Sequence, residues 1–418
     1  MSDANIKQHI VVVGAGIVGV SAAIWLARAG RNVTLLDRLA PGEGTSHGNA
    51  GILAACAMVP VTVPGLISKA PGYLLDKNFP LFMRWSYLPR LAPWLKQYLG
   101  YANDTDTPRI AEGLTTIVAD SVEQHQALAG NTAADSWLVP SDYQFAYLSK
   151  ESFEADSYVW DLRRRAGFIP ELVTGPAVHE KEPLLGSDIN LLAVCKDHGY
   201  VRSPGQYVKT LADVFKGLGG NIRQAEVVDF EHIDGKVSAV HTSGGTIECT
   251  ELVLATGVWS AELGRKLGVN IPLESERGYH VIFKNPSAMV NSPTMVTTGK
   301  FVATPMHDGM RCAGIVELGG LDAGPSQAPL ELLMNQVKKT FPDLTYSDTQ
   351  KWLGHRPAPA DSLPFIGEIG SSGVYMALGH HHIGLTGGPK TGRMISDLIT
   401  GDSFEDNIAP FNPMRFTR

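Results

Sequence analysis

Residues 9–38 read HIVVVGAGIVGVSAAIWLARAGRNVTLLDR. An apolar run leads into three glycines, Gly14, Gly16 and Gly19, and a second apolar run ends at Asp37. The first glycine permits a tight turn off a strand, the second lets the backbone approach a pyrophosphate, and the third lets a helix pack closely on a sheet. The stretch therefore predicts a strand, a helix and a second strand that together bind a dinucleotide.

The first turn of this helix, with Ile17 and Val18, is the predicted phosphate site, because unpaired N–H groups and the helix dipole favour an anion there. Asp37 is placed to accept hydrogen bonds from the hydroxyls of an adenosine ribose, and Arg38 follows it. The Asp37 carboxylate would repel a ribose phosphate. The stretch thus favours a dinucleotide whose ribose carries free hydroxyls.

The chain has 418 residues and a formal net charge of −7. This length exceeds that of one ordinary hydrophobic core, so we expect two closely packed domains. The acidic balance argues against a nucleic-acid partner. The four cysteines show no Cys-x-x-Cys spacing, which argues against a structural metal and against a disulfide framework. We therefore expect no metal ion, and reduced thiols in a cytoplasmic protein.

Apolar runs in the sequence stay shorter than the ~20 residues of a membrane span. Residues 59–101 are nevertheless rich in aromatic, proline and basic side chains, a mixture that also suits a lipid interface. Packing of this segment against the protein itself is the favoured interpretation. Peripheral contact with the inner face of the membrane is kept as an alternative.

Later stretches predict how the chain returns to its first domain. Residues 201–220 predict a helix with Ser203 as its cap, and residues 221–257 predict a three-strand meander followed by a buried strand. Residues 374–401 predict a strand, a glycine-rich loop and a helix. The buried strand and this terminal unit fit the sheet of the first domain.

Between residues 271 and 351, alternating strands and an amphipathic helix over residues 329–341 predict a second domain based on antiparallel sheet. The predicted fold class is α/β, with a Rossmann-like dinucleotide-binding domain and a second α+β substrate domain. The predicted domains are residues 1–55, 200–270 and 352–418 for the dinucleotide and residues 56–199 and 271–351 for the substrate.

Four elements occur in order along the chain: the opening glycine motif, TSHGNAG at residues 45–51, LATGVWS at residues 254–260, and GHRPAPADSLPFIG at residues 354–367 followed by GHHHIGLTGGPKTG at residues 379–392. Together they resemble the FAD-dependent D-amino acid oxidase superfamily, and most closely its D-amino acid dehydrogenase branch. The resemblance spans nearly the whole chain. It implies a flavoprotein oxidoreductase with non-covalent FAD.

The motif and the resemblance together assign the predicted FAD contacts to all of these elements. The residues are Gly14, Gly16, Ile17, Val18, Gly19, Asp37, Arg38, Thr45, Ser46, Asn49, Ala50, Gly51, Val228, Thr256, Gly257, Trp259, Gly354, Gly379, His380, His381, His382, Ile383, Gly384, Leu385 and Thr386. The chain carries a single dinucleotide fingerprint, so FAD would take its electrons from a small substrate. A pure NAD dehydrogenase is the alternative, but it leaves the C-terminal glycine loop without a purpose.

Oxidation of an amino acid requires its α-hydrogen to face the flavin, and a guanidinium that clamps the carboxylate fixes that geometry. Arg356 is the first candidate for the clamp. Arg277 and Tyr279, on one predicted strand, are the next candidates, and Tyr143 follows with weaker support.

Two departures from the family pattern bear on substrate choice. The arginine-proline pair Arg356-Pro357 is followed by Ala-Pro-Ala-Asp-Ser, where the family's arginine-proline segment continues with Thr-Pro-Asp-Gly. His381 and His382 stand where close relatives often carry glycine and a small residue. His380, His381 or His382 could aid deprotonation of the substrate or shape its pocket. His381 and His382 complete the set of predicted catalytic residues.

The expected reaction is oxidation of a D-amino acid, or of a cyclic secondary amino acid such as D-proline or a hydroxyproline, to its imine by hydride transfer, a step of amino acid catabolism. The electron acceptor would be a quinone, dioxygen or a partner protein. A glycine- or sarcosine-oxidase-like activity is the alternative among enzymes. A non-catalytic FAD-binding, membrane-associated protein is the alternative from another class.

Overall fold

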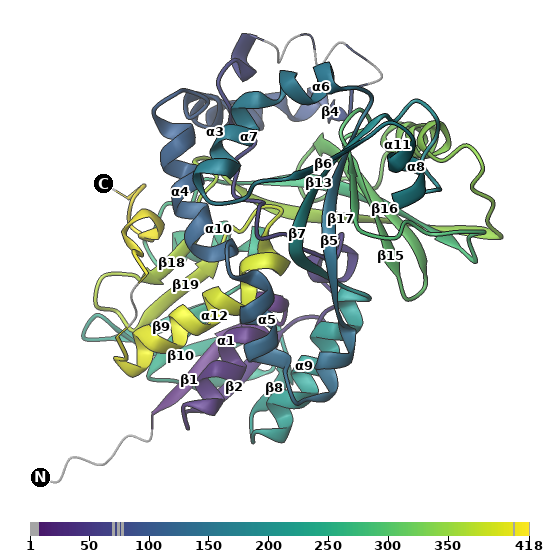
Figure 1. Cartoon of the computed structure of the whole chain (residues 1–418). Helices are drawn as coiled ribbons and strands as arrows, with labels where there is room; N and C mark the ends of the chain where they lie inside the picture. Colours follow the sequence, from purple (N-terminus) through teal and green to yellow (C-terminus); the bar gives the residue numbers. More distant parts are fainter. Residues whose placement is uncertain (1–7, 69–71, 73–75, 77–78, 404–405, 418) are drawn as a thin grey trace, which may run out of the picture.

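The computed structural model of the chain describes residues 8–68, 72, 76, 79–403 and 406–417. The described residues form a six-stranded sheet, a ten-stranded sheet and a three-stranded meander. Figure 1 shows β1, β2 and β8 of the first sheet on one side of the molecule and β13, β15 and β16 of the second sheet on the other. The predicted α/β fold class is confirmed.

The six-stranded sheet contains the sequence-predicted dinucleotide unit. In spatial order its strands are β18 (Phe365–Glu368), β19 (Val374–Leu378), β12 (Glu251–Leu254), β1 (His9–Val13), β2 (Asn32–Asp37) and β8 (Asn221–Gln224). All pairings are parallel except that of β18 with β19. A parallel sheet covered on both faces requires continuously apolar strands, and Val11 and Val12 of β1 are fully buried.

Helices cover this sheet. They include α1 (Ile17–Arg28), α4 (Asp106–Val118), α5 (Ser121–Ala129), α9 (Pro204–Gly217), α10 (Ser260–Lys266) and α12 (Gly384–Thr400). In Figure 1, α1 and α12 run side by side. Glycine makes this approach feasible, because a Cβ on Gly392 would stand 2.5 Å from the backbone nitrogen of Ala22. The terminal strand, loop and helix therefore pack on the first domain, as predicted.

The ten-stranded sheet contains the antiparallel strands predicted between residues 271 and 351. Its strands are β17 (Asp348–Pro359), β13 (Leu273–Lys284), β16 (Gly309–Leu318), β15 (Phe301–Met306), β14 (Thr294–Val296), β5 (Leu138–Tyr147), β7 (Leu191–Val201) and β3 (Ile52–Leu53), with β4 (Leu81–Met83) beside β16 and β6 (Glu171–Thr174) beside β7. Most pairings are antiparallel, whereas β14–β5 and β16–β4 are parallel. The amphipathic helix α11 (Gln327–Thr340) packs against β13 and β16.

Strand β17 bears on the predicted domain boundary between residues 351 and 352. It pairs with β13 from Asp348 to Pro359, so residues 352–359 lie in the second sheet. The chain crosses to the first sheet only after β17. The division into domains otherwise stays a prediction.

The remaining described elements are a three-stranded meander, further α-helices and short 3₁₀ helices. The meander consists of β9 (Val227–Ile233), β10 (Lys236–Thr242) and β11 (Gly245–Glu248), as expected. The other helices are α3 (Leu88–Gly100), α6 (Lys150–Ala155), α7 (Ser157–Arg165) and α8 (Pro176–Lys181), with short 3₁₀ helices η1 (Thr45–Gly48), η2 (Trp85–Tyr87), η3 (Ala133–Trp137), η4 (Gly257–Trp259) and η5 (Ala409–Phe411).

Two local expectations need comment. Ser203 occupies the N-cap of α9, but its side chain makes no capping hydrogen bond to the first turn, which the structure describes in full. Residues 69–71, 73–75 and 77–78 of the aromatic segment at 59–101 lie outside the described residues. Within the described part of the chain, no helix is long and apolar enough to cross a membrane.

Candidate active site

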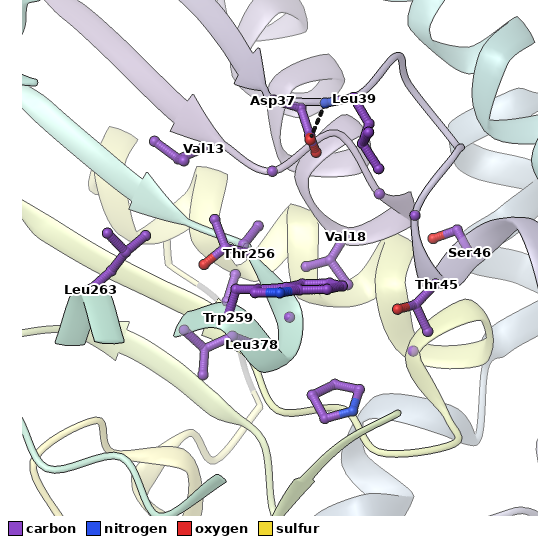
Figure 2. A pocket seen from close by; sticks show the side chains of 18 of the residues that line it. Val13, Val18, Asp37, Leu39, Thr45, Ser46, Thr256, Trp259, Leu263 and Leu378 are labelled. Atoms are coloured by element: carbon purple, nitrogen blue, oxygen red, sulfur yellow. Dashed lines mark hydrogen bonds between the residues drawn. The ribbon is translucent and has the colours of Figure 1, made fainter. Parts of the chain in front are cut away.

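A cleft of about 400 Å³ opens where β1, β2, β12 and β19 end. Ligands of open α/β sheets bind at the carboxyl ends of the strands. Figure 2 shows the side chains around this cleft, with Asp37 and Leu39 joined by a hydrogen bond at one side. The sequence-predicted residues that line it are Gly14, Gly16, Ile17, Val18, Asp37, Arg38, Thr45, Ser46, Asn49, Val228, Thr256, Gly257, Trp259, Gly379, His380, His381, Gly384 and Leu385.

The opening glycines shape one wall of the cleft. Gly14 has φ +110°, and a Cβ there would stand 2.3 Å from the carbonyl oxygen of Ala255. Gly16 precedes α1, and the backbone N–H of Ile17 donates to Oγ of Ser46 over 3.0 Å. The helix has no acidic residue in its first turn, a stretch that the structure describes completely. The partial positive charge of this helix end, with no acidic side chain in the first turn to offset it, fits a pyrophosphate.

Replacing Gly14 with alanine should abolish stable FAD binding. The new methyl group would collide with backbone rather than with a movable side chain, and φ +110° disfavours any side chain. The fraction of purified protein that carries FAD, read from its absorbance, measures the effect.

Gly217→Ala is the matched control, because no described atom lies within 4 Å of a Cβ at that helical position. It should retain FAD. Full flavin content in the Gly14→Ala protein would contradict the assignment of the cleft.

Asp37 connects the end of β2 to the glycine turn. Its Oδ2 accepts a hydrogen bond from the N–H of Ala15 over 2.7 Å, and its Oδ1 accepts one from the N–H of Leu39 over 2.9 Å. A carboxylate has about four lone-pair sites, so two bonds leave capacity for ribose hydroxyls. Beside it, the Arg38 guanidinium lies 4.5 Å from the ring centre of Trp259.

The segment 45–51 is held between the two sheets. Oγ1 of Thr45 donates to the carbonyl of His355 on β17 over 3.0 Å. Nη1 of Arg311, on β16, donates to the carbonyls of His47 and Asn49 over 3.1 and 2.7 Å. Burial lowers the pKa of Arg311 to about 10, so the guanidinium keeps its charge at neutral pH. The second sheet therefore fixes a wall of the cleft.

Seven predicted FAD contacts lie behind the lining or beside it: Gly19, Ala50, Gly51, Gly354, His382, Ile383 and Thr386. Gly19 serves packing, since its Cβ would stand 1.8 Å from the carbonyl oxygen of Gly14. Gly354 makes room for Trp352, whose ring would lie 1.9 Å from a Cβ there. Oγ1 of Thr386 donates to the carbonyl of Ile52 over 3.1 Å.

Several lining residues were not predicted from the sequence. They are Val13, Leu39, Gly44, Ala225, Glu226, Val227, Ala255, Glu262, Leu263, Lys266, Pro357, Ala377 and Leu378. Most flank a residue that was predicted, so the neighbourhood of each motif was the available signal. Glu262, Leu263 and Lys266 on α10 lie farther from any motif. Lys266 donates through Nζ to the carbonyl of Val228, which joins α10 to the predicted adenosine end.

The histidines of the C-terminal loop have different surroundings. Nε2 of His380 lies 2.9 Å from Oγ1 of Thr391, and burial lowers the pKa of His380 to about 4. His381 has φ +49°, and its N–H donates to the carbonyl of Pro357 over 2.9 Å. Nε2 of His381 lies 2.5 Å from Oε2 of Glu276, a residue of β13. The loop is thus tied to the second sheet beside the cleft.

Arg356 lies next to the hydrogen bond between His381 and Glu276. It stands directly across from Glu276 in the pairing of β17 with β13. A Cβ on Gly278 would stand 2.4 Å from Cζ of Arg356, so the guanidinium covers that glycine. Nη1 donates to the carbonyl of Ile315 over 3.2 Å. Burial lowers the pKa of Arg356, and Glu276 opposes that shift. The residue is half-buried and lies beside the cleft rather than in its lining.

An irregularity in strand β16 directs the carbonyl group of Ile315 toward Arg356. The pairing of β13 with β16 shifts by one residue here, and Ile315 has φ +59°, which is unusual for a β-branched residue. A bulge of this kind redirects backbone groups next to functional sites. The bulge therefore helps to fix the orientation of Arg356.

The other candidates for the clamp lie elsewhere. Arg277 is fully buried on the opposite face of β13, where its Nε is 2.9 Å from Oε2 of Glu317. The hydroxyl of Tyr279 donates to the same oxygen over 2.5 Å. Tyr143 is 5 % exposed and packs against Phe145, with ring centres 4.8 Å apart. The structure does not bring these three residues to Arg356.

His382 is exposed to solvent, and its ring centre lies 4.7 Å from that of His381. It is not among the residues that line the cleft, and it takes no part in the hydrogen bond between His381 and Glu276.

The fold and the cleft agree with comparisons to known proteins. The model of the family "FAD dependent oxidoreductase" matches residues 9–398. The chain is 35% identical to a D-amino-acid oxidase of Bradyrhizobium diazoefficiens, over 98% of this chain and 99% of that one. It is 28% identical to a D-amino acid dehydrogenase of Paramagnetospirillum magneticum, over 94% and 95% of the two chains.

Solved structures show the same fold. Glycine oxidase from Geobacillus kaustophilus superimposes with a TM-score of 0.73 at 21% identity, covering 98% of this chain and 99% of that one. L-Proline dehydrogenase from P. horikoshii gives a TM-score of 0.74 at 21% identity and covers 98% of both chains. The glycine turn, Asp37 and the helix end fit FAD, and the chain belongs to the family of FAD-dependent oxidoreductases.

Proposed function

We propose that the protein oxidises a D-amino acid, or a cyclic secondary amino acid of the D-proline or hydroxyproline type, to its imine. The position of Arg356 carries the proposal. Arg356 is half-buried and stands across from Glu276, whose carboxylate contacts His381 of the cleft lining. A guanidinium binds a carboxylate through two parallel charge-assisted hydrogen bonds. Relatives named D-amino-acid oxidase and D-amino acid dehydrogenase support the substrate class.

Each part of the site has a task in this reaction. Arg356 holds the substrate carboxylate and thereby directs the α-carbon toward the cleft. FAD, when bound, supplies the acceptor of the hydride from that carbon. The loop 379–385, which lines the cleft in part, and the segment 45–51 hold the flavin in place. His381 and His382 stand beside the carboxylate site and limit the size of the substrate side chain.

The test is anaerobic mixing of the FAD-loaded protein with enantiomeric pairs of amino acids, including proline and hydroxyproline. We expect the flavin absorbance to bleach with the D-enantiomer of at least one pair. Bleaching with glycine or sarcosine alone would instead assign the alternative oxidase activity. A spectrum that stays oxidised with the whole panel would favour a non-catalytic FAD-binding protein.

A peripheral contact with a lipid surface is part of the proposal, and it would bring a quinone within reach as the electron acceptor. Three apolar side chains of the segment 59–101 are exposed, namely Val61, Ile67 and Trp85, by 47%, 57% and 61%. Such side chains insert into the interface between lipid headgroups and acyl chains.

We expect the protein to sediment with anionic liposomes and Trp85→Ser to weaken this several-fold. Quinone reduction and dioxygen consumption, measured side by side, separate the acceptors. Protein that stays in the supernatant at all lipid concentrations would contradict the membrane contact and favour dioxygen or a partner protein.

A further inference from the structure

Glu276 and His381 form a buried pair that the FAD site does not require. The exposed fractions of the two residues are 5% and 7%, and Nε2 of His381 lies 2.5 Å from Oε2 of Glu276. His381 lines the cleft, whereas Glu276 lies behind it. The pair therefore links the cleft, through His381, to strand β13, where Glu276 stands across from Arg356.

The state of Glu276 determines which nitrogen of His381 can accept a proton. Burial would raise the pKa of Glu276, but His381, through its charge when protonated and through its hydrogen bond, and the guanidinium of Arg356 lower it. The carboxylate is therefore ionised at neutral pH and can only accept hydrogen bonds. Nε2 of His381 must then carry a proton, which leaves Nδ1 of the neutral ring as an acceptor.

Other charged and titratable groups surround the pair. Arg356 lies across the strand pairing from Glu276, and His382 follows His381 on the same loop. From α3, the hydroxyl of Tyr98 is buried with no hydrogen-bond partner among the described residues. Burial raises the pKa of Tyr98, and Glu276 raises it further, so Tyr98 stays neutral. Arg356 is then the permanent cation and Glu276 the permanent anion around His381.

These charges suit a zwitterionic amino acid. When the carboxylate of the substrate is bound to Arg356, its ammonium group lies near the pair, where the Glu276 carboxylate carries the opposite charge. An ammonium nitrogen has no free electron pair, so it must lose a proton before its α-carbon can release hydride. Proton transfer to a positioned histidine accelerates such steps by about 10²- to 10⁴-fold.

We propose that His381 accepts the proton of the substrate ammonium group and that Glu276 positions and stabilises it. The N–H bond breaks, its electron pair stays on the amine nitrogen, and the proton bonds to Nδ1 of His381. The resulting imidazolium faces the Glu276 carboxylate. The freed electron pair is then available to form the C=N bond, for which FAD, when bound, would supply the acceptor of the α-hydride. His381 is thus a catalytic residue and Glu276 a positioning residue.

This inference rests on the proposed function, and its test is the pH dependence of flavin reduction at saturating substrate, measured anaerobically. In the wild type we expect the reduction rate to rise with pH to a plateau. His381→Ala should lower the rate at neutral pH at least about 10²-fold and move the rise to higher pH, where the ammonium deprotonates unaided. Added imidazole should restore the rate at least tenfold, which a merely structural role would not allow.

Glu276→Gln should lower the plateau several-fold and move the rise to lower pH, because the imidazolium loses its counter-charge. Glu274→Gln is the matched control. Glu274 is a buried carboxylate on the same strand, but it accepts a hydrogen bond from Tyr87, 3.1 Å away. Its pH profile should move far less than that of Glu276→Gln, because Glu274 acts on Glu276 only through its charge and it is Glu276 that contacts His381.

Retained FAD and the spectral change caused by 2-aminoisobutyrate, which lacks an α-hydrogen, show that the carboxylate site is intact in each variant. A His381→Ala profile equal to the wild type, or a uniform loss that imidazole does not restore, would overturn the role of His381. A Glu276→Gln profile that does not move would overturn the role of Glu276. If His381→Ala fails to fold, this result alone would overturn the proposal for the pair. Wild-type protein that no amino acid reduces would instead overturn the proposed function itself.

Discussion

Replacing Arg356 with methionine should lower kcat/KM for flavin reduction by an amino acid roughly 10²- to 10⁴-fold while FAD stays bound. The variant loses two charge-assisted hydrogen bonds to the substrate carboxylate, each of about 1.5–3 kcal/mol. Methionine keeps the apolar stem of the side chain but lacks the guanidinium atoms that cover Gly278. Stopped-flow measurement of reduction across substrate concentrations separates the effects on kcat and KM.

A second variant and a second substrate test whether Arg356 binds the substrate carboxylate. Arg356→Lys should recover only part of the rate, because an ammonium group cannot form the two parallel bonds of a guanidinium. The decarboxylated amine of the best substrate should reduce the wild type and Arg356→Met at similar low rates, since it offers nothing to the clamp. An Arg356→Met enzyme with wild-type kinetics toward the amino acid would move the clamp elsewhere.

Replacing Arg277 with methionine should instead destabilise the fold, by about 3 kcal/mol or more. Arg277 is fully buried, and Glu317, 3% exposed, faces it at 2.9 Å. The exchange leaves a buried carboxylate without its main counter-charge, although Arg84 remains 3.2 Å from the other oxygen. Urea titration of the holoenzyme, followed by fluorescence, measures the loss in free energy of unfolding.

The pH dependence of that loss has a definite sign. Burial would raise the pKa of Glu317, but hydrogen bonds from Ser326 and Tyr279 and the charge of Arg277 lower it. A carboxyl group with a lowered pKa in the folded state stabilises the protein above its unfolded pKa, and this stabilisation fades as pH falls. The difference between wild type and Arg277→Met should therefore shrink in acid. An unfolding midpoint equal to that of the wild type at neutral pH would contradict the account.

The dinucleotide unit could be predicted from the sequence because its determinants are local. Gly14, Gly16 and Asp37 lie within one stretch, and each acts through the backbone of its own turn or strand end. The meander and the terminal strand, loop and helix followed from turn signals and apolar patterns in the same way. Arg356 depended on a family resemblance, and the structure places it beside the predicted loop.

Glu276 could not be predicted as part of the site, because its partners come from distant positions in the chain. His381 is 105 residues away in sequence, and the pairing of β13 with β17 brings Arg356 opposite. Sequence alone also leaves open which face of a strand meets a site, and a shift of one residue exchanges the faces. For this reason Arg277 and Tyr279 were candidates, although their side chains lie on the other face of β13 from that of Glu276.

The central claim is that a carboxylate-bound amino acid gives hydride from its α-carbon to FAD in this cleft. The most direct measurement is the anaerobic bleaching rate of the flavin with a D-amino acid and with the same compound deuterated at the α-carbon. The account predicts full bleaching with both and a slower rate with deuterium. Flavin that stays oxidised, or that bleaches equally fast with the L-enantiomer, would contradict it.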